Sequence, residues 1–126
     1  MPKAVMALII MLIVLPAAPL AAKVINIDDM YTIDVPGNWS MEADGNLLMV
    51  ISPDKKAVIF VTHSISVHFH KSKVAKVAEE KFPKLVKEQS DRWYTVTRGS
   101  RERRIIVTII GDHRDRTKIY YSIKEK

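Results

Sequence analysis

Three of the four histidines in this 126-residue chain, His63, His68 and His70, lie within one stretch of eight residues. The surrounding segment alternates polar and apolar side chains, and a metal site here depends on its being extended. In a strand, His68 and His70 share one face, with about 6–7 Å between them along the chain. That spacing suits a borderline metal ion, and it predicts a site for Zn, Cu(II) or Ni(II) with His63 or a carboxylate as third ligand.

The same histidines have a simpler interpretation, as exposed side chains that alternate with buried apolar ones. No Asp or Glu lies between Asp54 and Glu79, so no carboxylate is near in sequence to complete a metal site. His63 also has the wrong parity to share a strand face with the other two. A third interpretation is a protonation switch, because imidazole changes charge at about pH 6.5. The pattern leaves all three open.

Basic residues gather near two predicted turns. The first cluster, beside Gly99, consists of Arg98, Arg101, Arg103 and Arg104, and the second consists of Arg114, Arg116 and Lys118. If residues 93–98, 104–110 and 117–123 are consecutive strands, the two turns lie at opposite ends of the sheet and the clusters form no common patch. We expect the first cluster to contact an anionic partner, at about 1 kcal/mol per residue on an acidic membrane surface.

Charge is divided unevenly along the chain. Residues 23–54 hold one lysine against six acidic residues, whereas residues 55–126 hold eighteen lysines and arginines against eight acidic residues. The surplus favours acidic partners such as anionic lipid, a cell-surface polymer or an acidic protein. The alternative is a soluble domain whose basic residues are simply solvated. The chain has no cysteine, which excludes disulfides, thiolate metal sites and cysteine nucleophiles.

Residues 1–22 have the layout of a secretory signal peptide, with a basic start, an apolar centre and a small-residue exit. Two alternatives are a retained N-terminal anchor and a buried core helix. The strongly apolar stretch is short for the ~20 residues of a membrane span, and Pro16 and Pro19 interrupt helix, so cleavage is favoured. The mature protein is then residues 23–126, one domain that is periplasmic or secreted, and export argues against a nucleic-acid partner.

Alternating apolar residues predict a sheet, and we expect its strands at 31–35, from Trp39, 47–52, 57–62, 93–98, 104–110 and 117–123. The run at 57–62 is almost continuously β-branched or aromatic, which places it centrally in the sheet. Apolar residues from Val74 to Val86 follow helical spacing after a possible N-cap at Ser72. Pro83 predicts a kink or a break with both pieces on one face. The expected fold is α+β, an antiparallel sheet packed by one amphipathic helix.

No catalytic set emerges from the motifs. All four glycines fall at predicted turns, which leaves none for a phosphate-binding loop. Asp112 precedes His113 in a charged turn, but no nucleophile motif accompanies the pair. Lys76, Glu80, Lys84 and Glu88 are i,i+4 neighbours, so we expect ion pairs along the helix and a solvated face.

Two segments follow a known pattern, residues 31–39 (YTIDVPGNW) and residues 47–61 (LLMVISPDKKAVIFV). They resemble the PsbP/DcrB-like family of small exported α+β domains, and the later order of helix and strands extends the resemblance over 30–123. The resemblance implies an antiparallel sheet with helices on one side and a non-enzymatic accessory role on a larger complex. The chain departs from the pattern because it ends at Lys126, where such domains continue into another helix, and because it carries the histidine segment.

Together these features predict an exported, non-enzymatic binding or accessory domain of the cell envelope that docks on a protein or anionic partner. The alternative is a periplasmic carrier or sensor for Zn, Cu or Ni through His63, His68 and His70.

Overall fold

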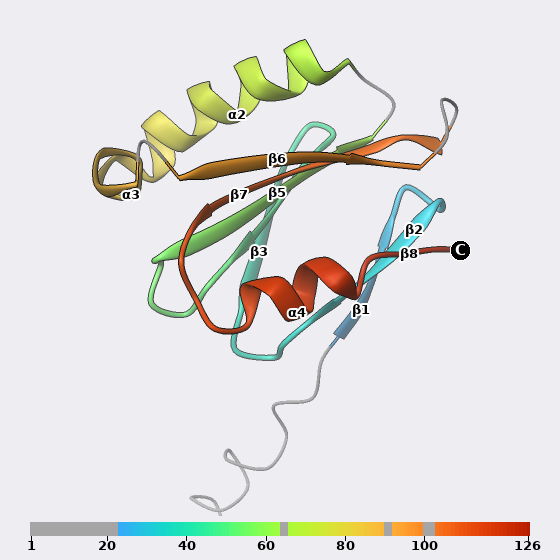
Figure 1. Ribbon diagram of the computed structural model, residues 1–126. Helices are drawn as coiled ribbons and strands as arrows, with labels where there is room; N and C mark the ends of the chain where they lie inside the picture. Colours follow the sequence, from blue (N-terminus) through green and yellow to red (C-terminus); the bar gives the residue numbers. More distant parts are fainter. Residues whose placement is uncertain (1–22, 64–65, 90–91, 100–102) are drawn as a thin grey trace, which may run out of the picture.

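The computed structural model describes residues 23–63, 66–89, 92–99 and 103–126, which form two antiparallel sheets and three helices. Figure 1 shows the layers, with two helices above the larger sheet and the smaller sheet and a third helix below it. The mixed α+β class is therefore confirmed. The expectation of one sheet and one helix is wrong, because residues 23–35 and 124–125 build a second sheet.

The larger sheet has the strand order β3-β4-β5-β7-β6. Its strands are β3 (Ser40–Asp44), β4 (Leu47–Ile51), β5 (Ala57–His63), β6 (Trp93–Arg98) and β7 (Ile105–Gly111). These bounds confirm the strands expected at 47–52, 57–62, 93–98 and 104–110 to within one residue at each end. The order also confirms the central place of β5.

Side-chain parity along β5 divides the core into two layers. Ala57, Ile59 and Val61 face the smaller sheet, whereas Val58 and Phe60 face the helices on the opposite side. All five are fully buried, which explains why this strand reads as a continuous apolar run.

Two helices cover one face of the larger sheet, α2 (Val67–Lys81) and α3 (Pro83–Glu88). Phe82 lies between them with a non-helical φ of −131°, so the expected break at Pro83 is confirmed. Buried Val74, Val77 and Leu85 keep both pieces on the same face, and each contributes about 1.5–3 kcal/mol of burial energy.

Helix α2 begins earlier than expected. Its N-cap is Ser66, whose side-chain oxygen accepts a hydrogen bond of 3.2 Å from the backbone N–H of Phe69. The expected cap at Ser72 is therefore wrong, and His68 and His70 are helical, not extended as the metal hypothesis requires. The buried residues His70, Val74, Val77 and Ala78 form one helical stripe, in which a polar residue occupies the first position.

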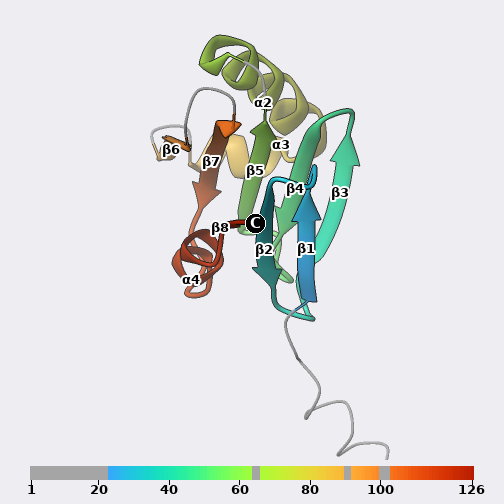
Figure 2. The same cartoon turned by 90° about the vertical axis from the view of Figure 1, so that its right-hand side faces the viewer.

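The smaller sheet lies on the other face of the larger one and has the order β1-β2-β8 (Figure 2). Its strands are β1 (Lys23–Ile27), β2 (Tyr31–Val35) and β8 (Lys124–Glu125). Strand β2 confirms the expectation for 31–35, and its buried Tyr31, Ile33 and Val35 pack into the layer between the sheets.

The segment expected as a final strand at 117–123 is instead helix α4 (Arg116–Tyr121). Ile119 and Ile123 are four residues apart and fully buried in the layer that contains β2 and β5. A helix therefore lies on the face of the larger sheet opposite α2, at residues where the sequence predicted a strand (Figure 1).

Residues 1–22, the expected signal peptide, lie outside the described part of the chain. Within that part, no helix has both the length and the apolar character needed to cross a membrane.

Candidate functional site

His70 is the buried centre of a polar chain beneath α2. Its Nδ1 lies 2.6 Å from Oγ1 of Thr62 on β5, and its Nε2 lies 2.7 Å from Oγ1 of Thr108 on β7. Thr108 in turn lies 2.9 Å from the hydroxyl of Thr95 on β6. A hydroxyl both donates and accepts, so either tautomer of the neutral ring has its two hydrogen bonds satisfied.

Burial sets the protonation state of His70. Removal from water lowers the pKa of its imidazole to about 4, and the positive charge of Lys71 acts in the same direction. The ring is therefore neutral at physiological pH, and it joins the helix to three strands as a structural group.

The three histidines do not form the arrangement that the metal prediction requires. His68 is exposed and lies two residues from buried His70, about 200° away around the helix axis. His63 ends β5, and its Nδ1 lies 3.2 Å from a carboxylate oxygen of Asp28. No three His, Cys, Asp or Glu side chains of the described residues form a group fit for a metal ion. The strand geometry behind the metal hypothesis is wrong.

The arginines near Gly99 largely contact the protein itself. The guanidinium of Arg98 lies 5.4 Å from the ring centroid of Tyr120 and donates to its carbonyl oxygen at 3.4 Å. Nε of Arg103 lies 3.2 Å from a carboxylate oxygen of Glu125, and Nε of Arg104 is buried. Arg101 lies outside the described residues. At least two members of the expected partner-binding cluster are thus occupied within the fold.

The second basic cluster is also tied to the fold. Arg116 on α4 donates to the carbonyl oxygen of Gly111 at 2.5 Å, and its guanidinium lies 6.0 Å from the ring centroid of Tyr94 on β6. Arg98 and Arg116 therefore connect β6 with α4 at two points.

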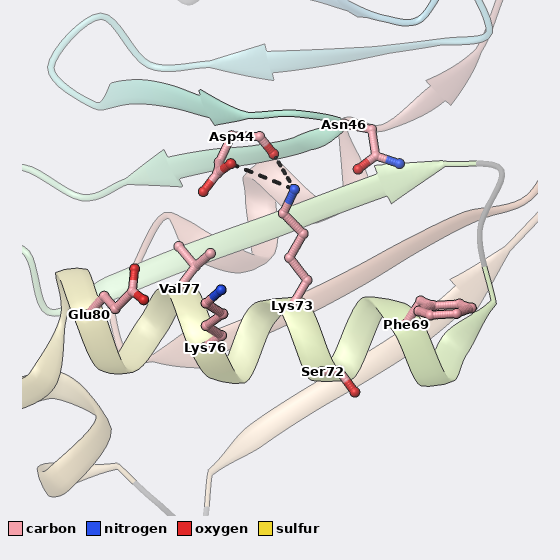
Figure 3. A pocket seen from close by; sticks show the side chains of 8 residues that line it. All are labelled: Asp44, Asn46, Phe69, Ser72, Lys73, Lys76, Val77 and Glu80. Carbon is pink, nitrogen blue, oxygen red and sulfur yellow. Dashed lines mark hydrogen bonds and ion pairs between the residues drawn. The ribbon is translucent and has the colours of Figure 1, made fainter.

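A groove of about 620 Å³ lies between α2 and the turn that joins β3 to β4 (Figure 3). Its lining residues are Asp44, Asn46, Phe69, Ser72, Lys73, Lys76, Val77 and Glu80. Nζ of Lys73 donates to the carbonyl oxygen of Asp44 at 2.7 Å and lies 3.7 Å from its carboxylate. Gly45 in the turn has a φ of +62°, and a side chain there would meet the Lys73 ammonium group. The absence of a side chain at Gly45 therefore leaves room for Lys73 of α2 to reach the turn.

In this groove the ring of Phe69 offers apolar contact, and the charge of Lys73 is already paired with Asp44. The side chain of Phe69 at one end is 68% exposed, and Lys73 spans the gap to β3. Ser72 supplies a hydroxyl, but no histidine is among the lining residues, so no serine nucleophile stands beside an imidazole base here.

A second groove, of about 420 Å³, lies where the turn between β4 and β5 meets the junction of α2 and α3. Four lysines line it, Lys55, Lys56, Lys81 and Lys84, and we call this surface the lysine groove. Its apolar residues are Phe82, Pro83 and Leu85, and two carboxylates, those of Asp54 and Glu88, also line it. A neighbouring hollow of about 410 Å³ shares Lys55, Lys81 and Phe82 with it, so the surface extends toward β3.

Most of the ammonium groups in the lysine groove are unpaired. Lys81 lies 3.8 Å from a carboxylate oxygen of Glu42, a weak contact between half-exposed side chains. The side chains of Lys55, Lys56 and Lys84 form no ion pair with the residues that the structure describes. The ion pairs expected along the helix, including Lys84 with Glu88, do not form.

The acidic residue in the turn is committed to local structure. Asp54 accepts hydrogen bonds from the Ser52 hydroxyl at 2.7 Å and from the backbone N–H of Lys56 at 3.0 Å. These two bonds lower the pKa of its carboxyl group, so Asp54 is ionised at neutral pH. Lys55 beside it has a φ of +59°, a left-handed conformation that is uncommon for a non-glycine residue. The turn therefore holds a lysine where glycine is conformationally easier.

The sequence interpretation missed the lysine groove because its residues are far apart in the chain. Lys55 and Lys56 belong to a turn, whereas Lys84 was assigned to a solvated helix face and Lys81 was not assigned to any site. The signal that was present is the Pro-Asp-Lys-Lys turn, since two consecutive lysines there add positive charge beside a buried strand.

Comparison with known proteins identifies no relative. No protein-family model, no curated protein and no solved structure matches the chain. The resemblance to PsbP/DcrB-like domains stays a hypothesis.

Proposed function

We propose that the protein is an exported, non-enzymatic accessory domain of the cell envelope that docks on an anionic partner through the lysine groove. The observation that carries this proposal is the set of three ammonium groups that form no ion pair with the described residues, on Lys55, Lys56 and Lys84, in a groove that four lysines line against two carboxylates, those of Asp54 and Glu88. Unpaired cations attract carboxylate or phosphate groups, and Phe82 and Leu85 add apolar contact.

Two further features support this proposal over the arginine cluster of the sequence analysis. Arg98 and Arg103 already contact Tyr120 and Glu125, so a partner would have to displace those contacts. The lysine groove also combines charge with concavity, which positions an anionic group better than a flat basic surface.

The test compares binding of the protein to vesicles that contain anionic phospholipid with binding to purely zwitterionic vesicles, and to polyglutamate. The triple variant Lys55→Glu, Lys56→Glu and Lys84→Glu removes the unpaired charges. At about 1 kcal/mol per lysine, we expect binding to weaken roughly 100-fold, and wild-type binding to weaken as salt is added.

The matched control makes the same change of net charge elsewhere, with Lys23→Glu, Lys71→Glu and Lys124→Glu. All three lysines are exposed and lie outside the lysine groove. An equal loss of binding in both triple variants would show that only net charge matters and would refute the groove. Preference for polyglutamate over vesicles would identify an acidic protein segment as the partner, and the reverse a membrane surface.

A further inference from the structure

Strand β6 is an edge of the larger sheet and lacks the usual protection of edges. It pairs with β7 on one side, and no described residue pairs with its other side. Its sequence, Trp-Tyr-Thr-Val-Thr-Arg, contains five β-branched or aromatic residues and neither proline nor glycine. Such an edge presents unpaired N–H and C=O groups to any strand that approaches.

The opposite edge shows what protection looks like in this same protein. Strand β3 carries Glu42 and Asp44, which lie within ion-pair distance of Lys81 and Lys73 on α2. Charged side chains on an edge strand oppose pairing with another strand. In β6 the one charged residue, Arg98, contacts Tyr120 of α4 and does not protect the edge.

Apolar side chains are also exposed along β6. Tyr94 is 57% exposed and Val96 is 37% exposed, and their even parity places both on the same face of the sheet as Arg98. Their burial by an added strand would remove apolar surface from water.

We propose that β6 pairs in antiparallel register with β6 of a second copy of this chain, so that two larger sheets become one continuous sheet. A two-fold axis at Val96 places this valine opposite its own copy. In the same register Tyr94 lies opposite Arg98 of the second copy, and Thr95 lies opposite Thr97. Apolar and hydroxyl pairs are favourable across antiparallel strands, and no arginine faces another arginine.

The register favours a second copy over a foreign strand because it places valine opposite valine and threonine opposite threonine, with no like charges opposed. The whole chain carries a formal net charge of +6, so two copies repel one another over a distance. Salt screens that repulsion, and we expect dimerisation to strengthen as salt is added, opposite to anion binding in the lysine groove.

The experiment measures the mass in solution of the protein expressed from the full-length chain, by sedimentation at concentrations up to about 1 mM. We expect a concentration-dependent dimer. Val96→Lys places two like charges opposite each other at the axis and should raise the dissociation constant about tenfold or more. The matched control is Val24→Lys, which makes the same change at a 67%-exposed valine on β1, an edge of the smaller sheet.

Because the protein has no cysteine, a second measurement locates the contact directly. Residues directly opposite in an antiparallel pair have Cα atoms about 4.5–5.5 Å apart, within the range of a disulfide. Val96→Cys should therefore cross-link two copies on mild oxidation much faster than Thr97→Cys, which lies opposite Thr95. Three results would each overturn the proposal, namely a monomer at every concentration, a dimer that Val96→Lys leaves intact, or equal cross-linking by both cysteine variants.

Discussion

Acidification should lower the free energy of unfolding through His70, whose imidazole is buried in the folded state and exposed in the unfolded one. The pKa of this ring is about 4 in the fold and 6.5 in its absence. Between these values the unfolded chain binds a proton that the folded chain does not, so stability decreases as pH falls. The contribution is complete above about pH 6.5 and is lost progressively down to about pH 4.

The size of the effect follows from the difference between the two pKa values. At 1.36 kcal/mol per pKa unit, the full loss is about 3 kcal/mol, of which about 2.5 kcal/mol falls between about pH 7.5 and about pH 4.5. A domain of this size has roughly 5–15 kcal/mol in total, so the loss is easily measured. Asp54 also has a lowered pKa, but its contribution is lost below its ordinary value of 3.8, outside this interval.

The assay is urea unfolding followed by circular dichroism at both pH values. His70→Gln keeps a hydrogen-bonding side chain but does not titrate, so the difference in stability between the two pH values should shrink by about 2.5 kcal/mol. His68→Gln is the control, because it removes an exposed histidine two positions away and leaves the buried ring in place. An equal pH dependence in wild type and His70→Gln would refute the assignment of this loss to the buried ring.

Further expectations concern turns, core and export. Gly111→Ala should destabilise the fold strongly, because Gly111 has a φ of +88° and an added Cβ would collide with the carbonyl oxygen of Lys56, which urea unfolding will show. Ile119→Ala should cost about 2–5 kcal/mol in the same assay, since α4 anchors the core through this fully buried side chain. Lys55→Gly should stabilise the fold by about 1 kcal/mol by relieving its left-handed backbone, yet weaken binding to anionic vesicles. Intact mass of the protein recovered from its host envelope should correspond to residues 23–126, and a full-length mass would contradict cleavage.

The strands that could be predicted are those whose burial follows their own sequence pattern. Strand β2 alternates buried and half-buried residues, and β5 is buried throughout, so periodicity and composition are sufficient there. The break at Pro83 was predictable too, because proline removes a backbone donor wherever it falls in a helix.

The two wrong elements share a physical cause, since local alternation competes with helical spacing. Val67 to His70 alternates like a strand, but His70 begins the stripe that continues through Val74 and Val77. The predicted stripe began at Val74 and left out His70, because His70 is polar. Ile119 and Ile123 likewise have the i,i+4 spacing of a helix, although Tyr120 and Tyr121 between them favour strands.

The uneven distribution of charge along the sequence was interpreted as evidence for acidic partners. In the fold, however, several acidic residues of the first segment contact basic residues of the second. Four carboxylates of the acidic segment lie within 4.0 Å of nitrogen atoms on basic residues of the later segment. These contacts are Asp28 with His63, Asp29 with Lys126, Asp44 with Lys73 and Glu42 with Lys81. The residues available to a partner are therefore the basic side chains that this internal pairing leaves over. Lys55, Lys56 and Lys84 are such side chains, and their common position at one groove makes a local anionic contact a better explanation of the surplus than a diffuse field.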